Sequence, residues 1–263
     1  MFEGYKLIDL STPLSNNPVS EARVSEIEYI DHESEQSVKR IMGRFDCTRE
    51  ELPNKNAKGE GLGNAVEVIH AGTHTATHLD APWHYSPICE GKRSKTIDEI
   101  PLEWCIGDGV VLDFRRFGDG HVITKAELQE ELARIGYTVK PFDIVFIMTG
   151  RDKEIHSKAY FEQPGMGREG TLWLAEQGVK IMGIDAWGFD TSFAKMKEAY
   201  KATGDNSVIW QAHLAGREKE YCHIEKLTNL DKLPPFGFTV ICFPVKIERA
   251  SAGWTRVVAL VKE

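Results

Sequence analysis

The 263-residue chain lacks the features that would place it in a membrane or on nucleic acid. All its hydrophobic runs are shorter than the roughly eighteen residues that a membrane-spanning helix needs. It has no stripe of Lys and Arg, and 40 acidic residues against 32 basic ones give a net charge of −8. Nucleic-acid binding needs a basic surface, so we expect no nucleic-acid or membrane partner. Acidic Glu3 and Asp9 stand where a signal peptide would have an apolar core, which predicts a cytoplasmic protein.

A disulfide framework and a domain linker are also missing. The five cysteines are odd in number, scattered and without a C-x-x-C pair: Cys47, Cys89, Cys105, Cys222 and Cys242. This pattern is typical of reduced thiols in a cytosolic enzyme. No internal repeat, low-complexity stretch or Pro/Ser/Gly linker divides the chain. We therefore predict one domain over residues 1–263.

Histidine, by contrast, is concentrated in one short segment. Four of the nine histidines lie within residues 70–84, together with Asp80. Neutral imidazole and carboxylate are the ligands of a catalytic divalent metal, zinc or manganese. The segment therefore predicts a metal site.

The spacing indicates which residues bind. In an extended chain, residues two apart share a face, so His74, His78, Asp80 and His84 would point the same way, with small Ala76 leaving room for an ion. A helix would also bring His74 and His78 together, but the threonines, glycine and proline of this segment disfavour one. The HExxH zinc proteases are excluded, because position 75 is threonine.

Each residue of the segment also has an alternative interpretation. Asp80 is a ligand or a carboxylate that orients a ligand imidazole. His84 is a general acid/base or a loose ligand. His70 ends an alternating run and is better explained as a structural residue. Cys89, five residues after His84, is a minor candidate for a nucleophile, because metal-activated water would make a thiol unnecessary.

Strand and helix patterns alternate through the chain. We predict strands at residues 5–10, 64–69, 109–114, 143–148, 179–184, 238–243 and 255–261. We predict helices at residues 124–135, where Thr124 and Glu127 form a capping box, and at 171–177, 193–203 and 207–214. Residues 20–62 are polar and irregular, which predicts a long loop that acts as a lid or binding loop. The pattern indicates an α/β class, a single layered domain with a mixed sheet.

At the histidine segment the chain resembles the cyclase family of metal-dependent hydrolases. The family pattern H-x-G-T-H-x-D-x-P-x-H is matched by His74–His84, with Ala76 in place of the usual glycine. Similar segments extend the resemblance over nearly the whole chain: Ile8–Ser15, Gly183–Asp190, Asn229–Leu230 and Pro244–Ile247. The resemblance implies a swivelling β/β/α fold and a homodimer or homotetramer.

The resemblance also implies a second metal position. In family members of the kynurenine formamidase type, a histidine and a glutamate placed like His213 and Glu225 complete that position, and Asp80 would bridge the two ions. The predicted metal ligands are then His74, His78, Asp80, His213 and Glu225, for one or two ions per chain, with His84 as the catalytic residue.

The implied activity is hydrolysis by metal-activated water. Family activities are those of kynurenine formamidase, isatin hydrolase and trans-dienelactone hydrolase, so the bond is an amide (an aryl formamide or a cyclic amide) or a lactone. Two alternatives stay open: a metal-dependent lyase or cyclase acting next to a carbonyl, and a non-catalytic metal-binding protein. No substrate-binding residue is assigned, although four aromatics could form a pocket: Trp187, Phe189, Trp210 and Trp254.

Overall fold

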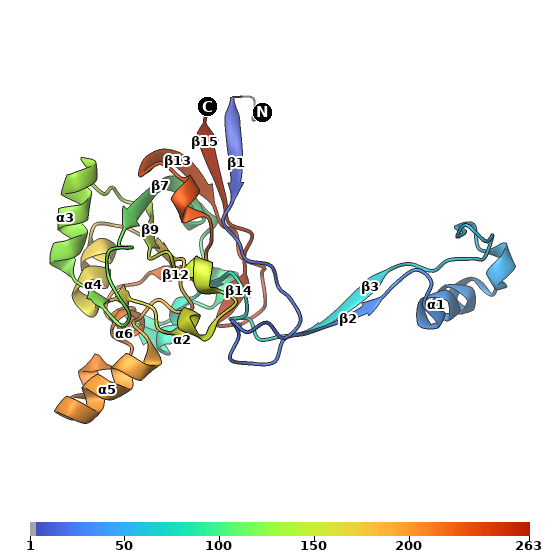
Figure 1. Ribbon diagram of the computed structural model, residues 1–263, viewed down its shortest axis with the longest axis horizontal. Helices are drawn as coiled ribbons and strands as arrows, with labels where there is room; N and C mark the ends of the chain where they lie inside the picture. The colour runs from blue at the N-terminus through green and yellow to red at the C-terminus, as the bar shows by residue number, and fades with distance from the viewer. Residues whose placement is uncertain (1–3) are drawn as a thin grey trace. The chain divides into compact units, whose positions relative to one another are not determined.

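The computed structural model describes residues 4–263, which form two compact units (Figure 1). The main unit contains residues 4–14, 18–22 and 73–263. The second unit contains residues 15–17 and 23–72. The α/β class predicted from the sequence is confirmed, and the single-domain organisation stays a prediction.

The main unit is built on a nine-stranded mixed sheet. From edge to edge its strands are β1 (Tyr5–Asp9), β15 (Val258–Lys262), β13 (Phe236–Ile241), β7 (Ile106–Asp113), β9 (Ile144–Met148), β11 (Ile181–Ile184), β12 (Cys222–Glu225), β4 (His78–Asp80) and β14 (Ala252–Trp254). The four central strands β7, β9, β11 and β12 run parallel. The outer strands on both sides pair antiparallel, so the parallel order ends where β12 meets β4.

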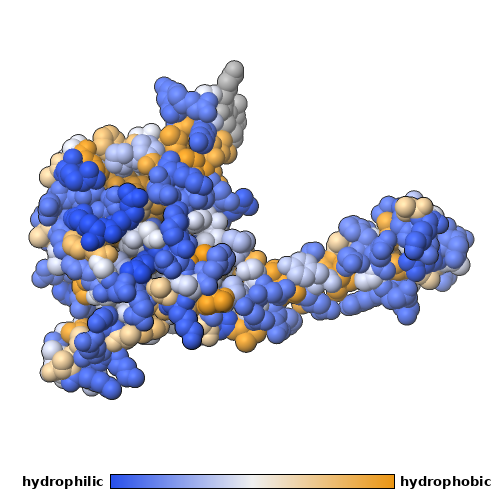
Figure 2. Space-filling view, viewed as in Figure 1, coloured by the Kyte–Doolittle hydropathy of each residue, from blue (hydrophilic) through white to orange (hydrophobic). Residues whose placement is uncertain are grey.

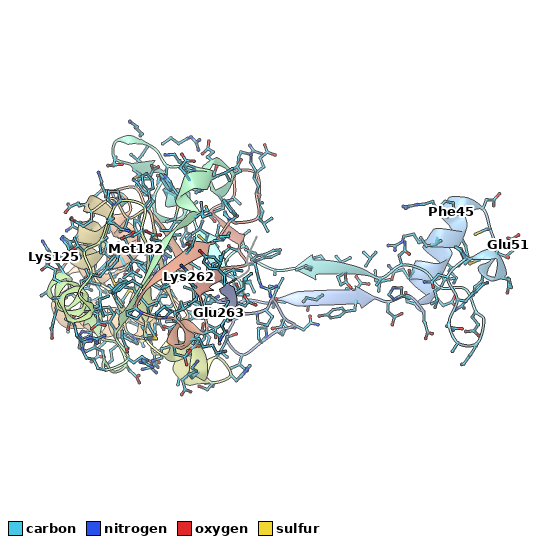
Figure 3. All side chains as sticks on the ribbon, turned by 90° about the horizontal axis from the view of Figure 1, so that it is seen from above. Phe45, Glu51, Lys125, Met182, Lys262 and Glu263 are labelled. Carbon is cyan, nitrogen blue, oxygen red and sulfur yellow. The ribbon has the colours of Figure 1, made fainter. Side chains whose placement is uncertain are left out.

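Both faces of the sheet are buried. Successive side chains of the central strands point to opposite sides, and other elements pack on each side. On one face, Val110, Val145 and Met182 pack with residues of the helices. These helices are α2 (Pro82–Tyr85), α3 (Lys125–Ile135), α4 (Arg168–Glu176) and α6 (Gln211–Ala215). On the other face, Val111 and Phe146 pack with Trp104 and with residues of β1 and β15. Figure 3 labels Lys125 at the start of α3 and Met182 within the sheet.

The remaining elements of the main unit are short, apart from helix α5. That helix spans Phe193–Thr203. Two small ribbons pair β8 (Val122–Ile123) with β10 (Gly165–Met166) and β5 (Ile88–Cys89) with β6 (Lys92–Arg93). The 3₁₀ turns are η2 (Ile97–Glu99), η3 (Leu102–Trp104), η4 (Arg151–Glu154), η5 (Lys158–Phe161), η6 (Asn206–Val208) and η7 (Leu230–Lys232).

The second unit corrects the prediction of an irregular loop over residues 20–62. Strand β2 (Glu26–Ile30) pairs antiparallel with β3 (Val66–His70), and α1 (Glu35–Phe45) and the 3₁₀ turn η1 (Arg49–Glu51) follow β2. Ser34 caps α1 by accepting the Ser37 N–H. Phe45, labelled in Figure 3, repeats the apolar spacing of Val38. The prediction failed because the many charged residues of this stretch masked its helical period.

Elsewhere the predicted elements are close to the observed ones. The capping box at Thr124 opens α3, and Gly136 ends it in the left-handed conformation. The helix predicted over residues 207–214 is interrupted, because Trp210 has φ +51° and separates η6 from α6. The strand at 64–69 is confirmed as β3, and it is mostly exposed because it pairs with β2 in a two-stranded ribbon.

The surface agrees with the composition. The face drawn in Figure 2 is largely hydrophilic, with hydrophobic residues in small areas. Among residues 4–263, no helix has the length and apolar character that crossing a membrane requires.

Candidate metal centre

The centre is built on two neighbouring strands that carry the same pattern. Strand β4 reads His78-Leu-Asp80 and strand β12 reads His223-Ile-Glu225. In their antiparallel register His223 lies opposite Asp80, and Glu225 lies opposite His78. Residues directly opposite each other share a face, so two imidazoles and two carboxylates form one block of side chains.

A tight turn places His74 beside this block. The prediction of one extended face from His74 to His84 is wrong in detail: only His78–Asp80 is a strand, His74 lies in the turn before it, and His84 lies on α2. Ala76 has φ +54°, a conformation that glycine adopts at less cost, which accounts for a glycine in the family pattern. This turn places His74 Nδ1 beside Asp80.

A buried ion pair holds this turn. The Lys226 ammonium lies 2.7 Å from Glu21 Oε2 and donates to the His74 carbonyl at 2.9 Å. Glu21 Oε1 accepts the Ala76 N–H at 2.7 Å. Both charged side chains are almost fully buried. Lys226 directly follows Glu225, so the residue after strand β12 fixes the backbone that carries His74.

The first group of potential ligands surrounds one oxygen of Asp80. His74 Nδ1 is 2.8 Å and His78 Nε2 is 3.3 Å from Asp80 Oδ1. Glu225 Oε2 lies 3.6 Å from the same His78 nitrogen. His74, His78 and Asp80 are close enough together to hold a metal ion. Three of the predicted ligands therefore meet as the sequence indicated.

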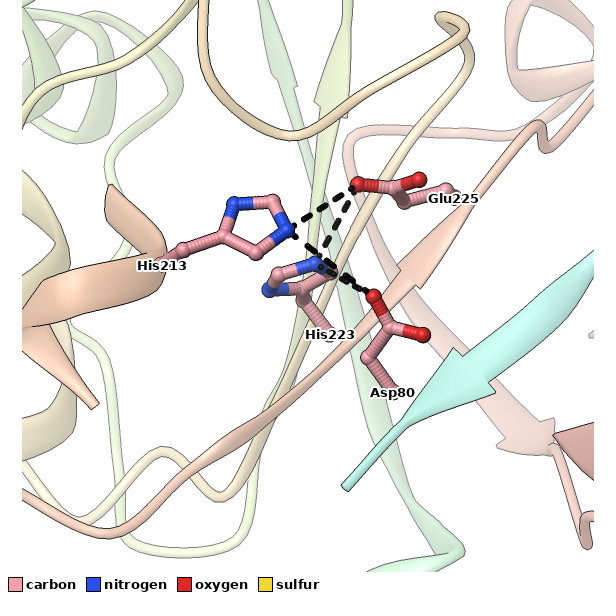
Figure 4. A group of neighbouring side chains, drawn as sticks. All are labelled: Asp80, His213, His223 and Glu225. Atoms are coloured by element: carbon pink, nitrogen blue, oxygen red, sulfur yellow. Dashed lines mark ion pairs between the residues drawn. The ribbon is translucent and has the colours of Figure 1, made fainter. Parts of the chain in front are cut away.

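The second group surrounds the other oxygen of Asp80 (Figure 4). His223 Nε2 lies 3.2 Å from Asp80 Oδ2 and 3.3 Å from Glu225 Oε1. His213 Nε2 lies 4.0 Å and 3.8 Å from the same two oxygens. Asp80, His213, His223 and Glu225 form a second set that could hold an ion. The five predicted ligands are thus brought together, and each carboxylate faces both groups.

Helix α6 and the loop after β11 orient the second group. The Asp190 carboxylate accepts the backbone N–H groups of Ala212 and His213, and it lies 2.5 Å from His213 Nδ1. This fixes the ring with Nε2 toward Asp80 and Glu225. The Phe189 N–H donates to Glu225 Oε1 at 2.9 Å. A carboxylate behind a ligand imidazole is the usual support of a metal-binding histidine.

The residues fit a divalent cation. Among the described residues, His78 Nε2, His223 Nε2 and both oxygens of Asp80 are buried without a hydrogen-bond partner. Buried polar atoms are rarely left unpaired, because losing water without a replacement costs about 1–3 kcal/mol per group. Imidazole nitrogen and carboxylate oxygen are also the donor types that zinc and manganese accept. One cation in each group would satisfy all four atoms.

The charges of the centre are set by burial and by mutual contact. Burial acts against charge on Asp80, but the imidazoles of His78, His84 and His74 hold its pKa well below the usual value. Burial also opposes charge on Glu225, yet the His223 imidazole 3.3 Å away lowers its pKa to about 2. Both carboxylates are therefore ionised at neutral pH. In the absence of another cation they raise the pKa of His223 to about 9, against the effect of burial.

His84, the predicted catalytic residue, lies at the edge of the centre. Its Nε2 is 3.8 Å from Asp80 Oδ2, and 30% of its side chain is exposed. Its ring lies 4.1 Å from that of His74. Burial lowers the pKa of His84 to about 4, so the ring is neutral at neutral pH and can accept a proton.

Three other sequence candidates, Cys89, Phe189 and Trp210, lie outside the two groups of potential ligands. Burial raises the pKa of Cys89 to about 11, so its thiol is protonated and is a poor nucleophile at neutral pH. Phe189 is fully buried and stacks on His223 at 4.4 Å, so it supports the ring of that histidine. Trp210 is 43% exposed, and its ring stacks on that of His213 at 5.8 Å.

Sequence reasoning missed His223. Its neighbour Glu225 was assigned, but the alternating pattern His-x-Glu, which matches His78-x-Asp80, was not used as a signal. Glu21 and Lys226 were missed as well, because an isolated acid and an isolated lysine carry no local pattern.

Comparison with known proteins agrees with this geometry. The Cyclase family model matches residues 8–191, which is more than half of the chain. A kynurenine formamidase of Erythrobacter litoralis is 27% identical over 199 residues, covering 76% of this chain and 78% of the relative. An isatin hydrolase of Roseibium aggregatum is 25% identical over 200 residues, covering 72% of each chain.

Structural comparison gives the same fold. A crystal structure of an isatin hydrolase bound to the product analogue thioisatinate superposes with a TM-score of 0.77 at 20% identity, covering 99% of this chain and 94% of the other. The chain belongs to the cyclase family, as its sequence pattern predicted.

Proposed function

We propose that this enzyme is a metal-dependent amide hydrolase whose substrate carries an aromatic ring. One observation carries the proposal: buried imidazole and carboxylate atoms without hydrogen-bond partners converge beside a neutral, partly exposed histidine. The hydrolase names of its relatives support the same reaction class. Activity on a lactone is the alternative within this class.

The residues that would hold the metal are His74, His78, Asp80, His213 and Glu225. A bound divalent ion, zinc or manganese, polarises a carbonyl and lowers the pKa of water from about 15.7 to about 7. Asp80 and Glu225 keep their negative charge in the buried centre because of the surrounding imidazoles. Asp190 fixes the direction of His213.

His84 would move the proton. As water attacks the amide carbon, a carbon–oxygen bond forms and one water proton passes to the neutral His84 ring. His84 then gives that proton to the leaving nitrogen as the carbon–nitrogen bond breaks. Its partial exposure leaves room for substrate on the outer side of the ring. Such general acid/base catalysis contributes about 10²–10⁴-fold in rate.

Aromatic side chains beside the centre support an aromatic substrate. The ring of Trp210 lies over His213, and Phe193 lies between Trp210 and Trp187 at 6.2 Å and 5.3 Å. Phe193 and Trp210 are both about half exposed. A flat ring stacked there would be held by offset or edge contacts. This favours an N-acylated aromatic amine or a ring-fused cyclic amide.

The test combines metal content with hydrolysis. Protein purified without chelator is assayed on N-formylkynurenine, isatin and a dienelactone, with His78→Ala as the variant and exposed His156→Gln as its matched control. We expect one or two ions per chain and hydrolysis of one of the two amides. His78→Ala and chelation should remove that activity, and added zinc or manganese should restore it in the chelated protein.

Other outcomes would contradict the proposal in different ways. Hydrolysis of the dienelactone alone would show that the enzyme is a lactone hydrolase. Bound metal without hydrolysis of any substrate would favour the lyase alternative. A protein that takes up neither zinc nor manganese would remove the metal centre itself. The homodimer or homotetramer and the cytoplasmic location stay predictions, which gel filtration and cell fractionation address.

A further inference from the structure

Two tyrosines determine which nitrogen of the His223 ring carries a hydrogen. The Tyr221 hydroxyl donates to the Ala212 carbonyl at 2.8 Å, and the Tyr85 hydroxyl donates to the Asp80 carbonyl at 3.2 Å. A hydroxyl has one proton to give, so both oxygens can only accept from the His223 ring. They lie 3.3 Å and 3.1 Å from His223 Nδ1. Nδ1 therefore carries the hydrogen, and a neutral ring has its lone pair on Nε2.

The same arrangement holds for two neighbouring histidines. His78 Nδ1 donates to the Ala76 carbonyl at 2.8 Å, and His213 Nδ1 contacts Asp190 Oδ2. In both, the Nε2 lone pair points toward Asp80 and Glu225. When these rings are neutral, three lone pairs and two carboxylates converge, and all of them are acceptors. Such a cluster of acceptors needs a cation at its centre.

We propose that His223 is a metal ligand, and that it completes a second position with four protein ligands: Asp80, His213, His223 and Glu225. The inference rests on the proposed metal centre. The separations fit: two ligands, each at about 2.0–2.2 Å from a zinc ion with tetrahedral angles, lie about 3.3–3.6 Å apart. His223 Nε2 is 3.2 Å and 3.3 Å from its carboxylate neighbours.

With His223 included, the two positions have matching sets of donor residues. Each has one histidine from a strand, His78 or His223, and one from outside it, His74 or His213. Each also has one oxygen of Asp80 and one of Glu225. A position with two imidazoles favours zinc more than a position with one. We therefore expect two ions of the same metal per chain with similar affinity.

The experiment measures metal stoichiometry and affinity in the full-length protein, independently of activity. Metal-free protein is titrated with zinc by calorimetry, and bound metal is counted by mass spectrometry. We expect two ions in the wild type and one in His223→Gln, whose amide can still hydrogen-bond the two carboxylates. Exposed His156→Gln should keep two ions.

Tyr221→Phe tests the role of the tyrosines with a smaller change. Its ring packing is retained, but His223 Nδ1 loses one acceptor. We expect two ions, with the second bound about 10–100-fold more weakly, as for other groups that orient a ligand histidine. The ¹⁵N chemical shifts of His223 give a further readout: zinc should shift Nε2 while Nδ1 stays protonated.

Two results would overturn the assignment of His223. In the first, the wild type binds one ion, His223→Gln also binds one, and both ring nitrogens of His223 carry protons, so the ring is an imidazolium that takes the place of a second metal. In the second, His223→Gln binds two ions with wild-type affinity. Neither result touches the proposed hydrolase function. That function fails only if the wild type binds no metal or hydrolyses no substrate, so the two failures can be told apart.

Discussion

The two groups of potential ligands differ in how the chain assembles them. His74, His78 and Asp80 come from seven consecutive residues, a turn followed by a short strand. Asp80, His213, His223 and Glu225 come from β4, α6 and β12. The first group depends on local backbone conformation, whereas the second depends on strand register and on helix packing. Both groups nevertheless share the two carboxylates. Substituting a carboxylate should therefore affect both groups, whereas substituting a residue of one group should affect that group alone.

The largest expected effect comes from removing a shared carboxylate. Asp80→Asn takes the charged oxygen from both groups, and we expect bound metal to fall close to zero and hydrolysis to background. Metal analysis and the hydrolysis assay check this, with exposed Asp119→Asn as control. If Asp80→Asn keeps one tightly bound ion, the carboxylate is not shared, and the two positions are not linked through Asp80.

The next effect separates metal binding from proton transfer. His84→Ala should lower kcat by about 10²–10⁴-fold while the metal content stays that of the wild type. The reason is that His84 lies 3.8 Å from Asp80 at the edge of both groups and is neutral at neutral pH. Loss of an ion in this variant would instead assign His84 as a ligand.

A third change acts on the first group alone. Lys226→Met leaves Glu21 buried without its partner, and we expect a loss of about 3–5 kcal/mol in the free energy of unfolding. Because the ion pair holds the turn that carries His74, one ion should also bind more weakly than in the wild type. Urea unfolding and zinc titration measure the two effects. The exposed pair Lys195–Glu198 is the control, and Lys195→Met should cost less than about 1 kcal/mol.

The smallest change relieves strain in the same turn. Left-handed backbone costs an L-residue about 1–2 kcal/mol, and glycine loses about 0.5–1 kcal/mol through greater freedom in the unfolded chain. Ala76→Gly should therefore stabilise the protein by about 0.5–1 kcal/mol with unchanged metal content. Thermal unfolding monitored by circular dichroism checks this, and a fall in the melting temperature would show that the Ala76 side chain contributes packing that outweighs the strain.

The contrast between the two groups also explains what the sequence predicted. His74, His78 and Asp80 could be assigned because the whole donor set lies within one segment, even though the expected extended conformation was wrong for His74. His213 and Glu225 were assigned only through family resemblance. His223 lies in a His-x-Glu pattern like that of His78 and Asp80, but the pattern alone does not show that β12 pairs with β4 in the register that sets His223 opposite Asp80. Capping at Thr124 and the buried central strands were predictable because their signals are local.

The place of β4 in the sheet determines when the centre can form. Its two neighbours, β12 and β14, both come from the C-terminal part of the chain. The ribosome delivers His78 and Asp80 long before these strands exist, and pairings between distant segments form slowly. During synthesis the histidine segment therefore stays unpaired until β12 and β14 have been made. We expect the purified chain to refold at the same rate with and without zinc. The reason is that the binding site would form only in the last step, when β4 pairs with β12 and β14.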